Sequence, residues 1–310
     1  MKQSPLFGFF LATIAVIMWG LLPIVLQPIF HAMDVQTIVW FRFFSAMVGT
    51  FFILLFKKKL PSFKQIDTKQ FLLILLGVFG LSCNFFLFNL ALHYIPPAAS
   101  QVITPLSSFI MIFASVVLFK EVIGIHQKIG LITLIIGLLL FFKHRLADFS
   151  MMNDYAFGIL YAVIASLIWI CYGIAQKLML KRSSSLQILL MIYIGCSIIF
   201  TPVANFSQVF ELTPFMSACL IFCCLNTVIA YGCYAEALNR WEVAKVSVMM
   251  TQIPIITIIF AEVIYYCMPS YFAKPELSLS SLIGVLLVVC GAALSAIGHK
   301  IFYANRPLDK

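Results

Sequence analysis

The sequence predicts an all-α integral membrane protein in which ten transmembrane helices form two inverted five-helix repeats. Three observations predict this fold: the composition, ten long apolar runs, and a set of residues that recurs along the chain. Of the 310 residues, 63% are hydrophobic and 10% are charged, and the mean hydropathy is +1.08. A soluble chain carries about 25% charged residues, so this composition indicates a protein with many membrane spans.

The apolar runs give the second observation, because a helix needs about 20 apolar residues to cross a bilayer. The first run follows one lysine and is too long for a cleaved signal core, so we interpret it as the first span. The expected spans are 6–26, 36–56, 70–92, 98–119, 125–142, 156–176, 187–205, 215–238, 246–268 and 279–298.

The basic residues predict how these spans are oriented. With the N-terminus in the cytoplasm, sixteen of the 20 Lys and Arg residues lie on the cytoplasmic side. Lys143, Arg145 and Lys274 lie outside, and Arg42 falls within a span. Because positive loops stay cytoplasmic, we expect a multi-pass protein of the bacterial cytoplasmic (inner) membrane with both termini inside. The net charge of +9 therefore reflects topology and contact with the lipid bilayer, and we expect no nucleic acid partner.

The third observation is an internal repeat. The window GFFLATIAVIMWG at 8–20 shares five of its thirteen positions with GILYAVIASLIWI at 158–170. One shared residue is a tryptophan, Trp19 or Trp169, and the chain holds only four tryptophans. Four of the shared positions fall on one face of a helix. The pattern therefore predicts that one structural unit occurs twice.

Further matches extend the repeat to the whole chain. Pro105 and Pro254 are 149 residues apart and keep the same order within their halves. We expect the first repeat at 6–142, the second at 156–298 and a cytoplasmic tail at 299–310. An odd number of spans per repeat inverts the second copy, as in secondary transporters whose two faces open alternately. A duplicated scaffold without transport is the alternative.

Glycines recur at matched positions in the last span of each half. Gly130 and Gly137 correspond to Gly284 and Gly291, and small residues at this kind of spacing let membrane helices approach closely. The two spans could pack on each other or on a second copy of the chain. The sequence leaves the oligomeric state open.

Several short motifs resemble those of one family when they are taken in order. They are Trp19, Arg42, Ala91-Leu92-His93-Tyr94 leading to Ala98-Ala99-Ser100, Pro105, and Phe119-Lys120-Glu121. Their order, spacing and duplication resemble the EamA-type branch of the drug/metabolite transporter superfamily, over roughly 8–142 and 158–298. The resemblance implies ten helices, a substrate cavity between the halves, and export of amino acids or other small metabolites.

Amide and aromatic side chains are the first candidates to line such a cavity. An offset of 146 residues relates Asn84 to Ala230 and Phe88 to Tyr234, and Asn226 lies one turn before Ala230. A buried amide in a membrane needs a partner, which is either a substrate or another helix. The two interpretations carry equal weight for each asparagine.

The paired tryptophans are the second candidates. Trp19 and Trp169 lie deeper in their spans than an interfacial belt requires. We interpret them as walls or gates of the cavity, with tight helix packing as the alternative. Tyr172 extends the face of Trp169, and Gln101 belongs to a polar stripe that includes Thr104. We expect these residues to contribute to substrate binding.

Prolines and intramembrane charges are candidates for gating or coupling. Pro105 and Pro254 each remove a backbone hydrogen bond and could act as hinges or as fixed kinks. Arg42 could reach the membrane surface or pair with Glu262, and Glu236 could pair with Arg240. Because ionisable groups inside a bilayer are functional candidates, either glutamate could couple transport to a proton or hold a substrate amine.

These observations predict a secondary transporter for a small-molecule substrate, with amino acids or related compounds first and cationic drugs second. The histidines show no metal-ligand spacing, and the chain has no phosphate-binding glycine loop, so we expect no metal, no cofactor and no enzymatic activity. The nine cysteines lie mainly in apolar runs and are expected to be packing residues.

Overall fold

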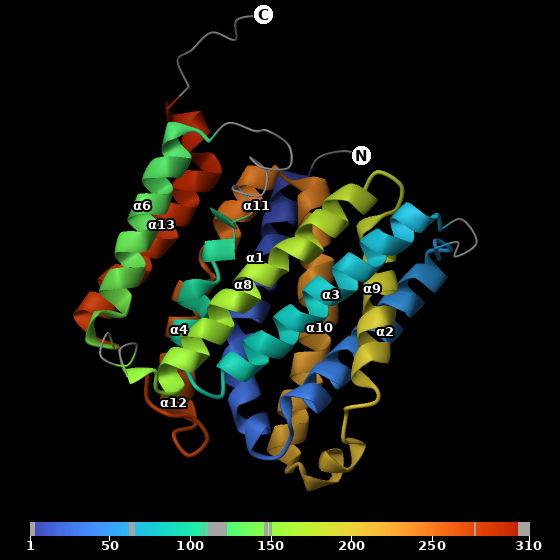
Figure 1. Ribbon diagram of the computed structural model, residues 1–310, viewed down its shortest axis with the longest axis horizontal. Helices are drawn as coiled ribbons and strands as arrows, with labels where there is room; N and C mark the ends of the chain where they lie inside the picture. The colour runs from blue at the N-terminus through green and yellow to red at the C-terminus, as the bar shows by residue number, and fades with distance from the viewer. Residues whose placement is uncertain are drawn as a thin grey trace, which may run out of the picture.

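The structure is a computed structural model that describes residues 4–61, 66–107, 109–110, 123–145, 148, 151–275 and 277–302 (Figure 1). Every regular element within these ranges is a helix. The α-helices are α1 (Pro5–Leu26), α2 (Val35–Phe56), α3 (Thr68–Ala91), α4 (Pro97–Ile103), α6 (Ile125–Phe141), α8 (Asp154–Met179), α9 (Ser185–Phe200), α10 (Pro214–Arg240), α11 (Val243–Met250), α12 (Ile253–Cys267) and α13 (Leu279–Phe302). Three short 3₁₀ helices lie between them in the described residues: η1 (Gln27–His31), η3 (Lys143–Arg145) and η4 (Phe206–Glu211).

The prediction of an all-helical, multi-span chain is confirmed at the level of the described residues. Seven stretches are long and apolar enough to cross a membrane, and α11 and α12 together form one of them. Two shorter apolar helices, α6 and α9, also match expected spans. The span expected at 98–119 is described only in part, because residues 108 and 111–119 lie outside the described residues, as do Lys120 and Glu121. The count of ten helices therefore stays a prediction.

Side-chain caps explain where several helices begin. Asp34 accepts a hydrogen bond from the Thr37 backbone N–H at the start of α2, and Asp67 accepts one from Gln70 at the start of α3. Ser184 caps α9 in a reciprocal capping box with Gln187. Each cap satisfies an amide group that has no partner inside its own helix. These polar residues stand where the chain enters and leaves the apolar runs.

The helices pack in pairs that correspond between the two halves. Helix α1 packs along α10, and the matching pair is α8 with α3. Helix α2 packs on its counterpart α9, and α6 packs on its counterpart α13 at one edge of the molecule (Figure 1). The largest cluster of buried side chains lies among α2, α3, α8, α9 and α10. Nearly every close pairing therefore joins one half to the other.

The matched glycines lie at the contact between α6 and α13. A Cβ atom at Gly137 would lie 2.7 Å from the carbonyl oxygen of Gly284, and one at Gly130 would lie 2.5 Å from that of Gly291. Only glycine allows the two backbones to approach this closely. The spacing noted in the sequence thus serves packing between the two helices of one chain.

The spans that contain the matched prolines Pro105 and Pro254 are both interrupted next to these residues. Helix α4 ends at Ile103, followed by a turn at Thr104 and Pro105. In the second half, α11 ends at Met250 and α12 begins at Ile253, with Pro254 in its first turn. Because proline has no N–H, neither residue can donate to the preceding turn. The span expected as one helix at 246–268 is therefore two helices.

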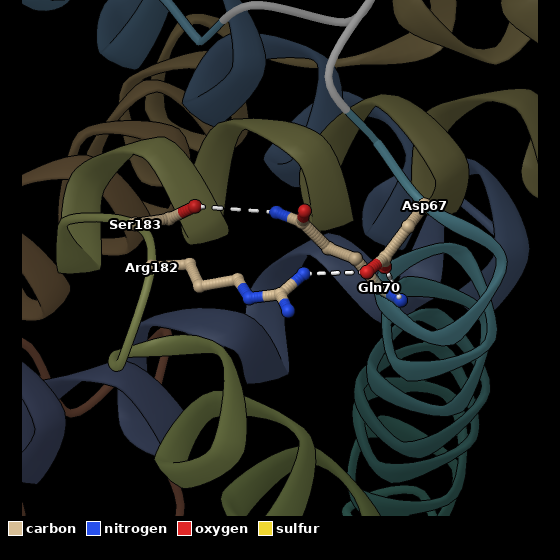
Figure 2. A network of polar contacts seen from close by, with 4 residues as sticks. All are labelled: Asp67, Gln70, Arg182 and Ser183. Carbon is tan, nitrogen blue, oxygen red and sulfur yellow. Dashed lines mark hydrogen bonds and ion pairs between the residues drawn. The ribbon is translucent and has the colours of Figure 1, made fainter.

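A set of polar contacts joins the two halves at the end of the molecule where α3 begins. Figure 2 shows Arg182, in the turn after α8, paired with the carboxylate of Asp67. Gln70 donates a hydrogen bond to the Ser183 hydroxyl at 3.3 Å, and Gln187 donates one to the Lys59 carbonyl at 3.0 Å. The hydrogen bond from the Gln70 backbone, followed by the contact with Arg182, holds the pKa of Asp67 below its usual value.

Candidate functional site

A cavity of about 270 Å³ lies where the helices of the two halves meet. Its walls come from α1, α2, α3 and α4 of the first half and from α8, α10, α11 and α12 of the second. Apolar and aromatic side chains make up most of the wall, and amides and hydroxyls are spaced among them. This mixture of apolar walls and a few polar groups is typical of small-molecule sites.

Aromatic rings from both halves meet in the cavity. The ring of Tyr231 lies 5.3 Å from that of Trp19 and 6.3 Å from that of Trp169, measured between centroids. Trp19 also lies 5.5 Å from Tyr234. The matched tryptophans thus lie on either side of one tyrosine, at distances at which aromatic rings attract each other.

The offset of 146 residues holds for a second pair of cavity positions. Phe88 and Tyr234, which the sequence relates, both line the cavity, and so do Phe85 and Tyr231 at the same offset. The centroids of Phe85 and Tyr231 are 6.2 Å apart. Equivalent faces of α3 and α10 therefore turn toward the same space.

Two of the candidate amides line the cavity and also join helices. Asn84 donates a hydrogen bond to the Ala165 carbonyl at 2.9 Å, from α3 to α8. Gln101 donates one to the Trp19 carbonyl at 3.1 Å, from α4 to α1, and its own amide oxygen accepts from Thr104. At Asn84 one amide nitrogen joins two helices at the cavity wall, and its contact with substrate stays a prediction.

Asn226 and Tyr172 do not line the cavity. Asn226 is fully buried and donates a hydrogen bond to the Met18 carbonyl between α10 and α1. Tyr172 is buried against Trp169, with ring centroids 4.9 Å apart, one layer behind the wall. In this structure Asn226 joins helices and Tyr172 supports a wall residue. Their expected contact with substrate stays a prediction.

The helix interruptions border the cavity from both halves. Pro105 and Pro254 are wall residues, together with the neighbouring hydroxyls of Thr104 and Thr251. Thr104 donates to the Ser100 carbonyl at 3.3 Å, and Thr251 donates to the Val248 carbonyl at 2.7 Å. These hydroxyls satisfy carbonyl groups next to the interruptions, as irregular backbone inside a membrane requires.

Arg42 is turned into the protein, and it does not reach the membrane surface. Its side chain is 2% exposed and lines the cavity. The Nε group donates to the Thr227 hydroxyl at 3.2 Å, and the guanidinium carbon lies 4.5 Å above the centre of the Phe85 ring. An ion pair with Glu262 is absent among the described residues.

The two candidate glutamates lie away from the cavity wall. Glu236 pairs with Arg240 at 2.7 Å, one turn along α10, as the spacing predicted. Glu262 is partly exposed in α12. Arg42 is therefore the one charged side chain among the described residues that line the cavity.

Two further wall residues, Tyr231 and Asn89, are related to Phe85 by their positions in the sequence. Tyr231 could be found from the 146-residue offset, because it corresponds to Phe85. Asn89 lies one helical turn after Phe85, and its buried amide oxygen has no hydrogen-bond partner among the described residues. The described residues contain no group of three or more His, Cys, Asp or Glu side chains placed to hold a metal.

Comparison with known proteins identifies relatives of the whole chain. The model of the EamA-like transporter family matches twice, at residues 6–143 and 156–297. A protein of Haemophilus influenzae named "Uncharacterized transporter" is 52% identical over 301 residues, which cover 97% of this chain and 98% of that protein. The "Uncharacterized inner membrane transporter YhbE" of Escherichia coli strain K12 is 40% identical over 304 residues, covering 97% and 95%.

More distant similarity extends to one named activity and to a solved structure. A "Probable amino-acid metabolite efflux pump" of Salmonella typhimurium is 22% identical over 309 residues, covering 94% of this chain and 95% of that protein. A crystal structure aligns with 99% of this chain and all of its own, with a TM-score of 0.66 and 16% identity. That structure shows the same fold. The resemblance read from the motifs is confirmed by the duplicated family match.

Proposed function

The chain belongs to the EamA-like transporter family, and we propose that it is a secondary transporter that exports a small metabolite, an amino acid or a related compound, by alternating access. As a member of this family it is a multi-pass membrane transporter. The name of its YhbE relative supports the bacterial inner membrane as its location. The substrate, the direction and the mechanism are the parts that we propose.

One observation carries the proposal: matched residues of the two repeats line one cavity. Trp19 and Trp169 face it from α1 and α8, and Pro105 and Pro254 border it at the two helix interruptions. A site at the seam between repeats, built from broken helices, is the arrangement that lets two halves rock around a fixed substrate. The correspondence of the α1–α10 and α8–α3 pairs supports an inverted repeat.

The class of substrate is supported by the walls and by a relative. Asn84, Gln101 and several hydroxyls offer hydrogen bonds, and the aromatic rings offer an apolar surface. The Salmonella relative is named for amino-acid metabolite efflux, and its 22% identity makes this a proposal for the present chain. A cationic drug is the weaker alternative, because the described wall residues include no carboxylate.

Proteoliposomes test the proposal directly. They are loaded with a mixture of labelled amino acids and related metabolites. The loss of each compound is compared with its loss from liposomes that carry the same mixture but no protein. We expect Ser247→Trp, which fills the cavity, to abolish loss, and Ile221→Trp, on a 59% exposed surface position, to leave it unchanged. If no compound leaves faster than from liposomes without protein, the chain would be better explained as a scaffold.

The same liposomes test proton coupling at Glu236 and Glu262. Each residue is replaced with Gln, and transport is measured over a range of external pH. A coupling carboxylate should lose its pH dependence when it becomes an amide, because the proton then has no site to bind. Unchanged pH profiles in both variants would remove the proton-coupling role from these residues.

A further inference from the structure

Arg42 is a buried cation in the wall of the cavity. Its side chain is 2% exposed, in a helix that crosses the membrane. Burying a charge in an apolar medium is costly unless the charge is paired, and such residues in membrane spans are usually paired or functional. The partners of Arg42 are therefore informative.

The described residues give Arg42 a hydrogen-bond acceptor and an aromatic contact but no negative charge. No carboxylate lies within ion-pair distance in the part of the chain that the structure describes. The Nε group donates to Thr227, and the face of Phe85 supplies a cation–π contact. The ionisable neighbours are Tyr231, Tyr193, Cys223 and Cys224, which are neutral at physiological pH. The positive charge has no negative counterpart among these groups.

The geometry leaves the outer part of the guanidinium available. Only Nε donates a hydrogen bond to a described residue, so Nη1 and Nη2 have no acceptor there. The residue lines the cavity, and the other described wall residues are uncharged. A guanidinium presents a planar fork of N–H groups that matches the two oxygens of a carboxylate. A solute carboxylate would supply both the missing charge and the missing acceptors.

We propose that Arg42 binds a carboxylate of the transported solute, so that the cavity selects small carboxylates over cations and uncharged compounds. This inference rests on the proposed transport function and names its substrate class. The rings of Trp19 and Trp169 provide an apolar surface for the rest of the solute. The proposal makes no demand on an amine of the solute, because the guanidinium of Arg42 would bind only the carboxylate.

Fluorescence quenching can test this without knowing the substrate. Replacing Trp40 and Trp241 with Phe leaves Trp19 and Trp169, both in the cavity wall, as the only tryptophans. In detergent, the ratio of iodide quenching to caesium quenching should be at least about threefold higher for this reporter protein than for free N-acetyltryptophanamide, because a positive cavity concentrates anions. Arg42→Gln should remove the preference, and Arg42→Lys should retain most of it. Arg240→Gln, whose charge is paired outside the cavity wall, is the matched control.

Competition then identifies the anionic group. 3-Phenylpropionate and phenylalanine should protect the reporter protein from iodide, whereas 3-phenylpropionamide and phenethylammonium should not. An equal iodide preference in the unaltered reporter and in Arg42→Gln would overturn the proposal. Equal protection by 3-phenylpropionate and 3-phenylpropionamide would also overturn it. So would a lack of protection by all three carboxylates tested, which are 3-phenylpropionate, phenylalanine and the smaller acetate. The reporter protein that keeps Arg42 is also a test without any Arg42 variant, because a lack of iodide preference in it would overturn the proposal.

The results separate this inference from the transport proposal. Quenching needs no transport, so a protein that binds carboxylates through Arg42 but empties no liposome refutes only the proposed function. A protein that exports its solute equally well with Arg42 and with Gln at that position refutes only the role of Arg42. Elution of each variant as a single folded species in gel filtration makes the comparison valid.

Discussion

Two asparagines show how much the setting of a single residue decides. Asn84 and Asn226 both donate their amide to a carbonyl of a neighbouring helix, so both stabilise helix packing. Only Asn84 also lines the cavity. A buried amide in a membrane protein can therefore have the same local chemistry with or without access to a solute.

Replacing each asparagine with Ala should separate these roles. We expect each variant to lose about 0.6–2 kcal/mol of stability, the range for a hydrogen bond between membrane helices. Only Asn84→Ala should change the apparent affinity for a transported solute. Unfolding of the solubilised protein measures the first effect, and transport at several solute concentrations measures the second. Equal changes in affinity would contradict the placement of Asn226 outside the site.

The charge of Asp67 should make stability depend on pH. Its pKa is lowered in the folded state, first by the Gln70 backbone hydrogen bond and then by Arg182. The stability that this carboxylate contributes is therefore present above the unfolded pKa of about 3.9 and is lost as the pH falls through the folded value. Asp67→Asn keeps a capping side chain but removes the charge, because Asn caps helices as well as Asp.

Thermal unfolding of the detergent-solubilised protein between about pH 6 and pH 3 measures this effect. The unfolding midpoint of the wild type should fall more steeply with acid than that of Asp67→Asn. Identical slopes for the wild type and Asp67→Asn would show that neither the Gln70 hydrogen bond nor the contact with Arg182 holds the carboxylate in its charged form.

At the scale of elements, close backbone contact and helix interruption are the two devices that build the fold. Helices α6 and α13 approach through glycines, whereas α4, α11 and α12 are interrupted beside prolines. The first device fixes a pair of helices at the edge of the molecule. The second places irregular backbone next to the cavity, where side-chain hydroxyls can satisfy it.

The glycine contact predicts a sharp contrast between two substitutions. Gly137→Ile should destabilise the protein by about 1–3 kcal/mol, because even a Cβ atom there would lie 2.7 Å from backbone atoms of α13. Gly232→Ala should be neutral or stabilising by up to about 1 kcal/mol, because no atom lies within 4 Å of its added Cβ and Ala favours helix. Unfolding midpoints in detergent compare the two. Similar losses in the two variants would contradict the close backbone contact between α6 and α13.

At the scale of the whole molecule, nearly all major contacts join the two halves, so neither half has a complete core of its own. The cavity lies at this seam, and the contacts of Asp67 and Gln70 with the α8–α9 turn join the halves at one end. Alternating access requires such contacts to break in one of the two states. The orientation of the repeats in the membrane is the feature on which this mechanism depends.

Cysteine labelling from outside the cell tests that orientation. In an inverted repeat with cytoplasmic termini, native Cys267, exposed at the end of α12, lies outside and should react with a membrane-impermeant maleimide. With Cys267 changed to Ser, Lys181→Cys should react only after the membrane is opened, and His144→Cys should react from outside. With the N-terminus in the cytoplasm, labelling of His144→Cys only after the membrane is opened would make the two repeats parallel and the alternating mechanism untenable for this chain.

Apart from those at 98–119 and 246–268, the expected spans agree with the described helices to within about five residues, because the bilayer imposes both length and hydropathy on each segment. The 246–268 span differed because a proline interruption splits a helix without reducing its hydropathy. Of the site candidates, Trp19, Asn84, Phe88, Gln101, Trp169 and Tyr234 line the cavity, and so do Arg42, Pro105 and Pro254. Repetition between the halves had singled out most of these positions.

The sequence by itself determined the class of protein, the helix positions, the repeat and the family, since each depends on composition or on order along the chain. The tertiary structure alone decided that Asn226 and Tyr172 lie behind the wall and that Arg42 turns into the cavity. Lipid and protein interior are equally apolar, so hydrophobic periodicity cannot tell which face of a membrane helix meets which. That rotation is set by the packing of neighbouring helices, and it places the charge of Arg42 in the wall of the cavity.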